Sequence, residues 1–200
     1  MKILLATGNK GKLKEMRELF NNIENITIIG LQDLPEVEEP VEDGNTFLAN
    51  AYIKCMYYYN KFKMPVISDD TGLMVDYLHG EPGVHTARYG SINGEHTDPK
   101  KNYEKILRKL NGVKERGCHF TTAMYFYDGR TLISSVGSMY GEVALKPEGI
   151  HGFGYDPIFF YPELGKTVAC LDEKEKNQIS HRGKASRLMI QQLKNYLLKF

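Results

Sequence analysis

The chain has 200 residues, enough to bury a hydrophobic core without help from disulfides or a structural metal. Lys and Arg number 26 against 25 Asp and Glu, so the formal net charge is +1. This balance argues against a general nucleic-acid binder, which usually carries a basic excess. Apolar residues make up 42% and charged residues 26%, which is ordinary for a globular protein and argues against intrinsic disorder.

The cysteines and the N-terminus indicate where the protein acts. Cys55, Cys118 and Cys170 are odd in number and far apart, without a Cys-x-x-Cys pair, which favours a reducing compartment over a disulfide framework. The apolar run that begins at Ile3 is too short for a signal-peptide core, and no stretch approaches the roughly 20 apolar residues of a membrane helix. We therefore expect a cytoplasmic protein with neither a membrane nor a nucleic acid as partner.

The first third of the chain alternates between strand and helix patterns. Apolar residues recur at helical spacing after the first strand, and Thr46 can cap a second helix. The expected elements are a strand at 3–6, a polar turn at 7–12, a helix from Leu13 to Ile23, a strand at 26–29, an exposed acidic loop at 32–45, a helix capped by Thr46, and a short strand at 65–68.

The remainder predicts a hairpin and two further helices. A Gly-rich stretch reaches residue 97, and Asp98-Pro99 is a good helix start. Strands at 117–127 and 130–138 flank Asp128-Gly129, a strong hairpin signal. A Gly loop at 149–157 leads into a strand at 158–161. The C-terminus is an amphipathic helix, and its apolar stripe consists of Ala185, Leu188, Met189, Leu193, Tyr196 and Leu197. We expect an α/β fold with a mixed sheet, as one domain over residues 1–200.

The turn between the first strand and helix has the properties of a phosphate-binding loop. It consists of Thr7, Gly8, Asn9, Lys10, Gly11 and Lys12. Glycines expose backbone N–H groups, a helix N-terminus adds partial positive charge, and two lysines add full charge. The spacing is not that of a Walker A loop, so an ordinary strand-to-helix turn with solvated lysines stays open as an alternative.

Two adjacent carboxylates, Asp69 and Asp70, follow the strand at 65–68. Carboxylates at the end of a strand are well placed for a hard cation. Neighbours on a strand point to opposite sides, so we expect one to face the site and the other to cap or orient the loop. Glu42 of the acidic loop could supply a second carboxylate. The sequence Asp-Asp-Thr-Gly is also a good turn, which remains the alternative.

Two further motifs could bind the flat part of a ligand. In the Gly loop, Phe153 or Tyr155 could stack on a base, and Asp156 could accept a hydrogen bond. Ser180-His181-Arg182 precedes a long helix and could place donors at its start. A Ser-His hydrolase is disfavoured because Ser180 and His181 are adjacent and no G-x-S-x-G elbow exists.

Together these motifs resemble the inosine/xanthosine triphosphate pyrophosphatases, the Ham1-like family of non-standard purine triphosphatases. Any one motif is weak, but five in this order are highly specific. The matching stretches are Thr7–Lys12, Ser68–Leu73, Pro82-Gly83 with Ala87–Tyr89, Gly152–Pro157 and Ile179–Gly183.

The resemblance implies an elongated mixed α/β fold of the Ham1/Maf type, with a central substrate cleft between two lobes, usually as a homodimer. It implies Mg²⁺-dependent hydrolysis of a purine nucleoside triphosphate to the monophosphate and pyrophosphate. The implied substrates are ITP, dITP and XTP, which arise by purine deamination. Their removal keeps hypoxanthine and xanthine out of DNA and RNA.

The resemblance also implies residue roles. Asp70 would be the general base and a metal ligand, and Glu42 the second metal ligand, although Asp43 or Glu39 could replace it. Residues Thr7 to Lys12 would grip the triphosphate, with Lys54 reaching the phosphates and Thr71 contacting substrate. Base and sugar would be held by Arg88, Phe153, Gly154, Tyr155, Asp156, Lys176, His181 and Arg182.

Two other functions compete with this one. A Maf-like pyrophosphatase of other base specificity would share the opening strand, loop and helix but should lack Ser180-His181-Arg182. A catalytically idle nucleotide-binding regulator is a rival of another class, and Asp70 beside a lysine-rich loop argues against it.

Overall fold

The computed structural model describes residues 1–20, 23 and 26–198, and these divide into two compact units. The first unit comprises Met1–Asp70, Thr122–Gly137 and His181–Phe200. The second unit comprises Thr71–Thr121 and Ser138–Ser180. That the two units act as a single domain over residues 1–200 stays a prediction.

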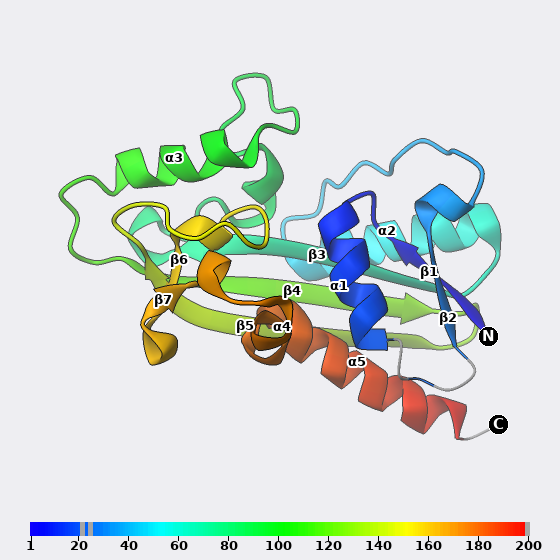
Figure 1. The fold of residues 1–200 in the computed structure, drawn as a ribbon. Helices are drawn as coiled ribbons and strands as arrows, with labels where there is room; N and C mark the ends of the chain where they lie inside the picture. The colour runs from blue at the N-terminus through cyan, green and yellow to red at the C-terminus, as the bar shows by residue number, and fades with distance from the viewer. Residues whose placement is uncertain (21–22, 24–25, 199–200) are drawn as a thin grey trace. The chain divides into compact units, whose positions relative to one another are not determined.

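Seven strands form one mixed sheet in the order β2-β1-β3-β4-β5-β6-β7. Strand β1 pairs in parallel with β2 and β3, whereas β5 with β6 and β6 with β7 are antiparallel (Figure 1). The expected mixed α/β fold is therefore confirmed. The strands are β1 (Lys2–Ala6), β2 (Thr27–Gly30), β3 (Val66–Val75), β4 (Gly117–Tyr127), β5 (Leu132–Val143), β6 (Phe159–Tyr161) and β7 (Lys166–Thr167).

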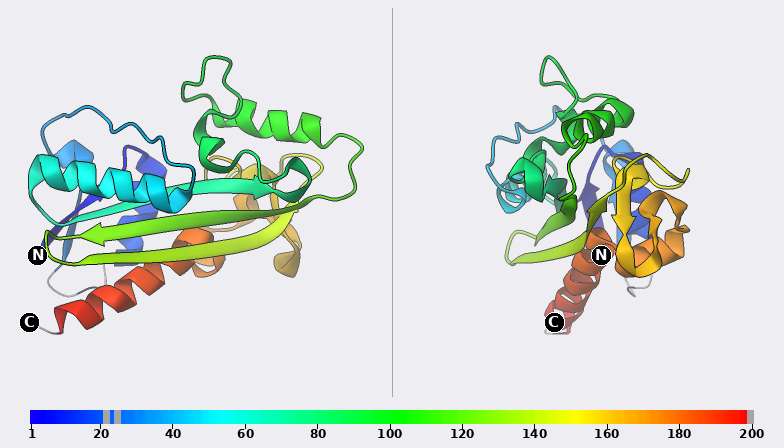
Figure 2. Two further views of the ribbon diagram at one scale, coloured as in Figure 1. Left: turned by 180° about the vertical axis from the view of Figure 1, so that it is seen from behind. Right: turned by 90° about the vertical axis from the view of Figure 1, so that its left-hand side faces the viewer.

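In the first unit, helices cover both faces of the sheet. Alternate residues of β1 point to opposite faces, so Ile3 packs with α1 (Lys10–Phe20) and α5 (His181–Leu197), while Leu4 packs with α2 (Phe47–Phe62). Figures 1 and 2 show α1 and α5 on one side of these strands and α2 on the other. Each face of the sheet is therefore covered by its own helices.

The second unit has a separate core, built around Leu73, Phe120 and Phe159. Helix α3 (Pro99–Lys109) packs on this core through Ile106, and its cap is Asp98, as expected. Helix α4 (Glu173–Ile179) was not predicted. It begins in a capping box, because Asp172 and Glu175 satisfy each other's backbone N–H groups.

The structure corrects several expected boundaries. Helix α1 begins at Lys10 instead of Leu13 because the Asn9 side chain accepts the Lys12 N–H at 3.1 Å. It ends at Phe20 instead of Ile23, beyond which residues 21, 22, 24 and 25 lie outside the described residues. The strand expected at 26–29 runs from Thr27 to Gly30.

Strand β3 differs most from the prediction. It does not end at residue 68 but continues to Val75, so Asp69, Asp70 and Thr71 lie inside a strand instead of a turn. Apolar Leu73 and Val75 fill the second unit's core and keep the backbone extended. What ends at Ser68 is the pairing with β1, whose last residue Ala6 lies opposite Ser68.

The hairpin and the last helix also shift in detail. Strand β5 begins at Leu132 because Asp128 accepts the N–H groups of Arg130 and Thr131, which extends the turn. On α5, Leu188 is 39% exposed and so leaves the expected buried stripe. No helix in the described residues is long and apolar enough to cross a membrane.

Candidate active site

The first unit gathers polar side chains where β1 gives way to α1. Thr7–Asn9 forms the turn, in which the Thr7 hydroxyl accepts the Asn9 N–H at 3.2 Å. Lys10, Gly11 and Lys12 form the first turn of α1 and therefore carry N–H groups that the helix itself leaves unused. This end of α1 has the partial positive charge and the donors that an anion requires.

Asp69 faces the α1 side of the sheet, where Lys12 neutralises it. The Lys12 Nζ lies 2.8 Å from Asp69 Oδ2, and Asp69 is only 1% exposed. Burial would raise the pKa of Asp69, but the charges of Lys12, Arg182 and Lys54 outweigh it and hold the pKa well below its usual range. Asp69 is thus a structural carboxylate that is ionised at neutral pH.

Asp70 faces the opposite side, toward α2. The Asn50 side chain donates from Nδ2 to Asp70 Oδ2 at 3.2 Å and accepts the Gly44 N–H at 2.8 Å through Oδ1. Burial raises the pKa of Asp70, and Glu42 adds to the effect, while Lys54 and Lys12 oppose it. Asp70 therefore has a higher proton affinity than an ordinary aspartate, as a general base requires.

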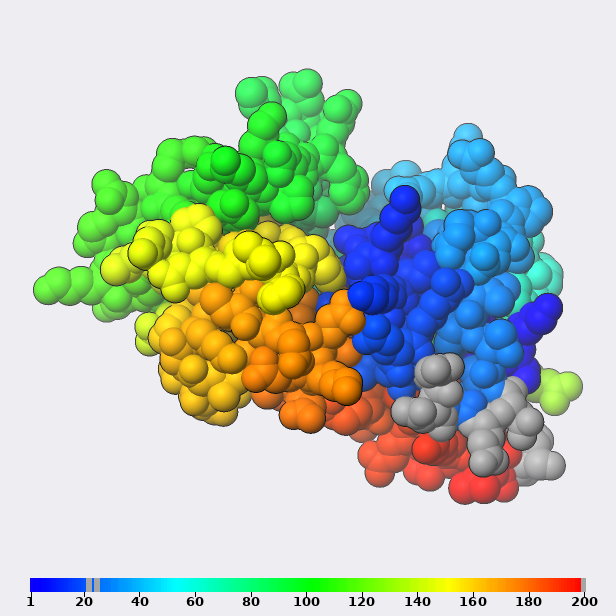
Figure 3. All heavy atoms as spheres, in the orientation of Figure 1, coloured from blue at the N-terminus to red at the C-terminus, as the bar shows by residue number. Residues whose placement is uncertain are grey.

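Lys54 connects the acidic loop to β3. Its Nζ lies 3.0 Å from Glu42 Oε2 and donates to the Asp69 carbonyl at 3.0 Å. Burial lowers the pKa of Lys54, but Asp69, Glu42 and Asp70 outweigh it and raise the pKa overall. Figure 3 shows the acidic loop, in light blue, at the surface above the darker blue of α1.

The oxygen donors around Asp70 fit a magnesium ion. Mg²⁺ is usually bound by one or two carboxylates, with waters and substrate phosphates completing its shell. Asp70 and Glu42 face the same region, since Glu42 raises the pKa of Asp70 and both carboxylates raise the pKa of Lys54. Over residues 1–20, 23 and 26–198, no group of three His, Cys, Asp or Glu residues forms a metal cage. A site of this kind would be completed by the substrate.

His181 and Arg182 begin α5 and are both buried in the first unit. The Arg182 Nη1 lies 2.5 Å from Glu15 Oε2 on α1. A guanidinium has five donors, so this ion pair occupies only part of Arg182. The pairing with Glu15 was not predicted. The sequence feature that could have indicated this pairing is the position of Glu15, one helical turn after Lys12 on α1.

The predicted Gly loop belongs to the second unit and is closed by a buried ion pair. Asp156 Oδ2 lies 2.7 Å from Lys176 Nζ and also accepts the Phe153 N–H at 2.8 Å. The Lys176 ammonium lies 4.5 Å from the centre of the Phe153 ring. Gly152 has φ +76, and a Cβ there would collide with Asp156. The loop is therefore rigid, with Asp156 and Lys176 holding the Phe153 ring in place.

The remaining predicted residues also lie in the second unit. Thr71 continues β3, Arg88 is an exposed residue at the end of a 3₁₀ helix over Gly83–Arg88, and Tyr155 is buried. The Tyr155 hydroxyl donates to the Thr86 carbonyl at 2.7 Å, which ties the Gly loop to the segment that carries Arg88.

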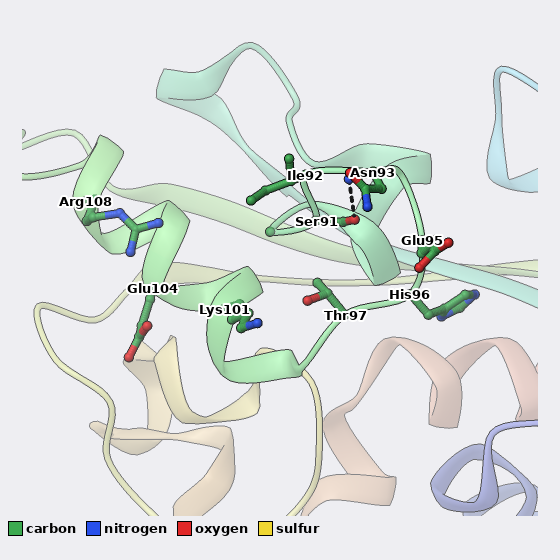
Figure 4. Close-up of a pocket in the computed structure, with 10 residues that line it drawn as sticks. Ser91, Ile92, Asn93, Glu95, His96, Thr97, Lys101, Glu104 and Arg108 are labelled. Atoms are coloured by element: carbon green, nitrogen blue, oxygen red, sulfur yellow. Dashed lines mark hydrogen bonds between the residues drawn. The ribbon is translucent and has the colours of Figure 1, made fainter.

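A hollow of about 370 Å³ also opens in the second unit, between residues 90–97 and α3 (Figure 4). Its lining carries both signs of charge, including Glu95, Lys101 and Arg108. None of the residues predicted for the site lines it.

Asn50, which contacts Asp70, is a site residue that was not predicted from the sequence. It is 2% exposed, and its single amide joins Asp70 to the acidic loop. It lies four residues before Lys54, on the same face of α2. That spacing was the signal available in the sequence.

The chain is similar to a known protein family over almost its whole length. The model of the Ham1 family matches residues 3–192. The dITP/XTP pyrophosphatase of Treponema denticola is 45% identical over 92% of this chain and 94% of its own, and that of Aquifex aeolicus is 38% identical over 98% of both. The solved structure of the Staphylococcus aureus Ham1 protein superimposes with a TM-score of 0.86, at 35% identity, over 98% of this chain and 100% of that one.

Proposed function

This chain belongs to the Ham1 family, and we propose that it hydrolyses the non-standard purine triphosphates ITP, dITP and XTP to the monophosphate and pyrophosphate. The observation that carries the proposal is the arrangement around Asp69 and Asp70. One carboxylate is neutralised by Lys12 and the other is held by an amide, beside the N-terminus of α1. The printed names of the relatives, dITP/XTP pyrophosphatases, support the choice of substrate.

Asp70 is the general base in this proposal. Asn50 holds its Oδ2 and leaves Oδ1 to take a proton from water. The raised pKa of Asp70 strengthens it as a proton acceptor, and the group still has to be ionised at the working pH. In phosphoryl transfer little covalent work falls to the protein, so positioning and charge stabilisation dominate.

Mg²⁺ is the proposed cofactor, held by Asp70 and Glu42. When bound it would neutralise charge on the phosphates. Lys54 already spans Glu42 and the Asp69 carbonyl, and so provides a second positive charge for a phosphate near these carboxylates. Glu42 is preferred over Asp43 and Glu39 because Lys54 directs its carboxylate toward β3.

In this proposal, residues Thr7 to Lys12 bind the triphosphate, and hydrogen-bond donors of the protein recognise the base. Hypoxanthine and xanthine carry an acceptor oxygen at position 6, where adenine carries a donor amino group. His181 and Arg182 are proposed to supply N–H groups to that oxygen. Thr71, Arg88, Phe153–Asp156 and Lys176 remain proposed contacts of the substrate from the second unit.

We further propose a cytoplasmic homodimer that has neither nucleic acid nor membrane as partner. The free thiols Cys55, Cys118 and Cys170 suit a reducing compartment, where the nucleotide pool is found. A dimer is implied by the family resemblance.

A panel of triphosphates tests the function directly. Purified protein is incubated with Mg²⁺ and ITP, dITP, XTP, GTP or ATP, and the released product is identified as pyrophosphate or orthophosphate. We expect pyrophosphate, fastest from ITP, dITP and XTP. Orthophosphate as the first product would contradict the proposal. Binding of ITP without any release would favour an idle nucleotide-binding regulator.

A further inference from the structure

Arg88 lies in a segment of the second unit, Thr86–Gly90, whose other residues are all fixed by neighbours. The Thr86 carbonyl accepts the Tyr155 hydroxyl, and the Thr86 hydroxyl accepts the Leu73 N–H at 3.0 Å. One end of the segment is thereby tied both to β3 and to the Gly loop. The other ties come from α3 and from Glu81.

Asn102 of α3 makes the central tie. Its Nδ2 donates to the Ala87 carbonyl at 3.3 Å, and its Oδ1 accepts the Gly90 N–H at 2.6 Å. One buried amide therefore bonds to the backbone on both sides of Arg88, using the donor and the acceptor that an asparagine offers. Either bond alone would leave the segment free to pivot, whereas the two together fix its position and direction.

Tyr89 is held as firmly as its neighbours. Its hydroxyl donates to Glu81 Oε2 at 2.6 Å, and its carbonyl accepts Lys105 Nζ at 2.6 Å. The Lys105 ammonium also lies 4.3 Å from the centre of the Tyr89 ring. The side chain of Tyr89 is buried and therefore cannot exchange places with that of Arg88.

Gly90 brings the segment into direct contact with α3. A Cβ on Gly90 would lie 2.7 Å from the Lys101 carbonyl carbon and 2.9 Å from the Asn102 nitrogen, both backbone atoms that cannot give way. Only glycine permits this approach, and the approach is what brings the Gly90 N–H within reach of Asn102.

Arg88 is the exception in this segment. Its side chain is exposed, and within the residues that the structure describes its guanidinium has no hydrogen-bond or ion-pair partner. We propose that Asn102 is a positioning residue that holds Arg88 ready to bind the nucleotide. This inference rests on the proposed function, since it takes the nucleotide as the ligand of Arg88.

The arrangement has a kinetic consequence. A guanidinium on a fixed backbone loses little freedom when it binds an anionic or carbonyl oxygen, so the segment contributes to affinity more than to the chemical step. Loss of such binding raises KM and leaves kcat nearly unchanged. We expect Arg88→Ala to raise the KM for ITP about 10- to 100-fold, the range for a hydrogen bond to a charged group.

A double-mutant cycle tests the coupling between Asn102 and Arg88. We expect Asn102→Ala to raise the KM for ITP roughly tenfold in the parent and to have no further effect in an Arg88→Ala background, because both changes remove the same interaction. Gly90→Ala should raise the KM in the same way, since it displaces the segment without altering Asn102. It replaces Asn102→Ala in the cycle if that variant does not fold. Lys100→Ala, an exposed change on the same helix, is the control and should leave KM unchanged.

The outcomes separate this inference from the proposed function. Equal losses from Asn102→Ala with and without Arg88 would show a general structural role and overturn the inference, as would an Arg88→Ala variant with the parent's KM. Pyrophosphate release by the parent decides the proposed function independently. Calorimetric titration of ITP into Asp70→Asn versions of the same variants gives a second readout that does not depend on turnover.

Discussion

Asp69 and Asp70 are neighbours in sequence but have opposite environments. Strand geometry turns one toward α1 and the other toward α2. The first meets Lys12 and has a lowered pKa, while the second meets an amide and a carboxylate-rich loop and has a raised pKa. We therefore propose two roles for these neighbours, a structural anion for Asp69 and a proton acceptor for Asp70.

Replacement of Asp70 tests the second role. We expect Asp70→Asn to fold as the parent does and to lose about 10²- to 10⁴-fold in kcat, because an amide accepts no proton and binds Mg²⁺ weakly. Turnover of ITP and thermal unfolding are measured together. Turnover equal to that of the parent would remove Asp70 from the base role.

Replacement of Asp69 tests the first role through stability. Asp69→Asn leaves buried Lys12 without its counter-charge, and we expect a loss of about 3 kcal/mol in the free energy of unfolding at pH 7. The sign of the pH dependence follows from the lowered pKa. Asp69 stabilises the fold above its unfolded value of about 3.9 and loses this contribution as the pH falls toward the folded pKa.

Urea unfolding of parent and variant between pH 7 and pH 3 checks this expectation. The difference between the two proteins should be largest near neutral pH and should shrink below about pH 4, because Asp69 of the parent's unfolded chain then takes up a proton while Asp69 of the folded protein stays ionised. A difference that stays constant over this range would show that the variant acts by a mechanism other than charge. Asp33→Asn, which removes an exposed partner of Arg17, is the matched control.

Replacement of Arg182 tests base recognition, but it also breaks the ion pair of Arg182 with Glu15. Arg182→Ala should narrow the preference for ITP over ATP in kcat/KM by roughly 10- to 150-fold, the cost of an unpaired buried donor facing adenine. It also leaves Glu15 without its ion-pair partner, which lowers stability. Glu15→Gln is therefore measured alongside. An ITP/ATP ratio that changes equally in both variants would mean that Arg182 acts through packing.

At the scale of elements, the sequence predicted the side-chain caps of two helices but not the length of β3. The Asp98 and Thr46 caps were readable because side-chain caps are local. The length of β3 was not readable, because what keeps Asp69 to Gly72 extended is pairing with strands distant in sequence. Likewise, Lys12 and Asp69 were each noticed, but only the parallel register of β1 and β3 brings them together.

The N-terminus of α1 provides a test at the same scale. Asn9 caps the helix through Lys12 N–H, so Asn9→Ala should cost about 1 kcal/mol of stability and misplace the donors of the first turn. We expect the KM to rise by a similar factor for ITP, XTP and GTP, since phosphate binding does not depend on the base. Asn9→Ser keeps a capping oxygen and is the control. A loss confined to one base would contradict the phosphate assignment.

At the scale of the whole molecule, the mixed α/β class followed from the strand–helix alternation, and the five motifs in order predicted the family. The family resemblance implied two lobes, but the boundary between the two units could not be predicted, because β3, β4 and β5 each contribute to both. No pattern along a strand marks where one core ends and the next begins. Contacts such as Arg182–Glu15, which join opposite ends of the chain, were hidden for the same reason.

The proposed homodimer has one face that can be tested. In the first unit, β5 presents Leu132, Ser134 and Val136 outward, an exposed and uncharged row. In the left view of Figure 2, the yellow-green strand β5 faces the viewer, and none of the described helices lies in front of it. Exposed apolar strand surface without charge invites association, and two identical uncharged faces do not repel each other across a twofold axis.

We expect Val136→Glu to convert the dimer to a monomer, because two buried carboxylates would then face each other at the contact without counter-charges. Light scattering coupled to size exclusion, run at several protein concentrations, measures the mass. Leu188→Glu places the same charge on an exposed position of α5, outside this face, and should leave the mass unchanged. A Val136→Glu variant that stays dimeric would place the contact elsewhere on the surface. A parent that is monomeric at every concentration would reject the dimer itself.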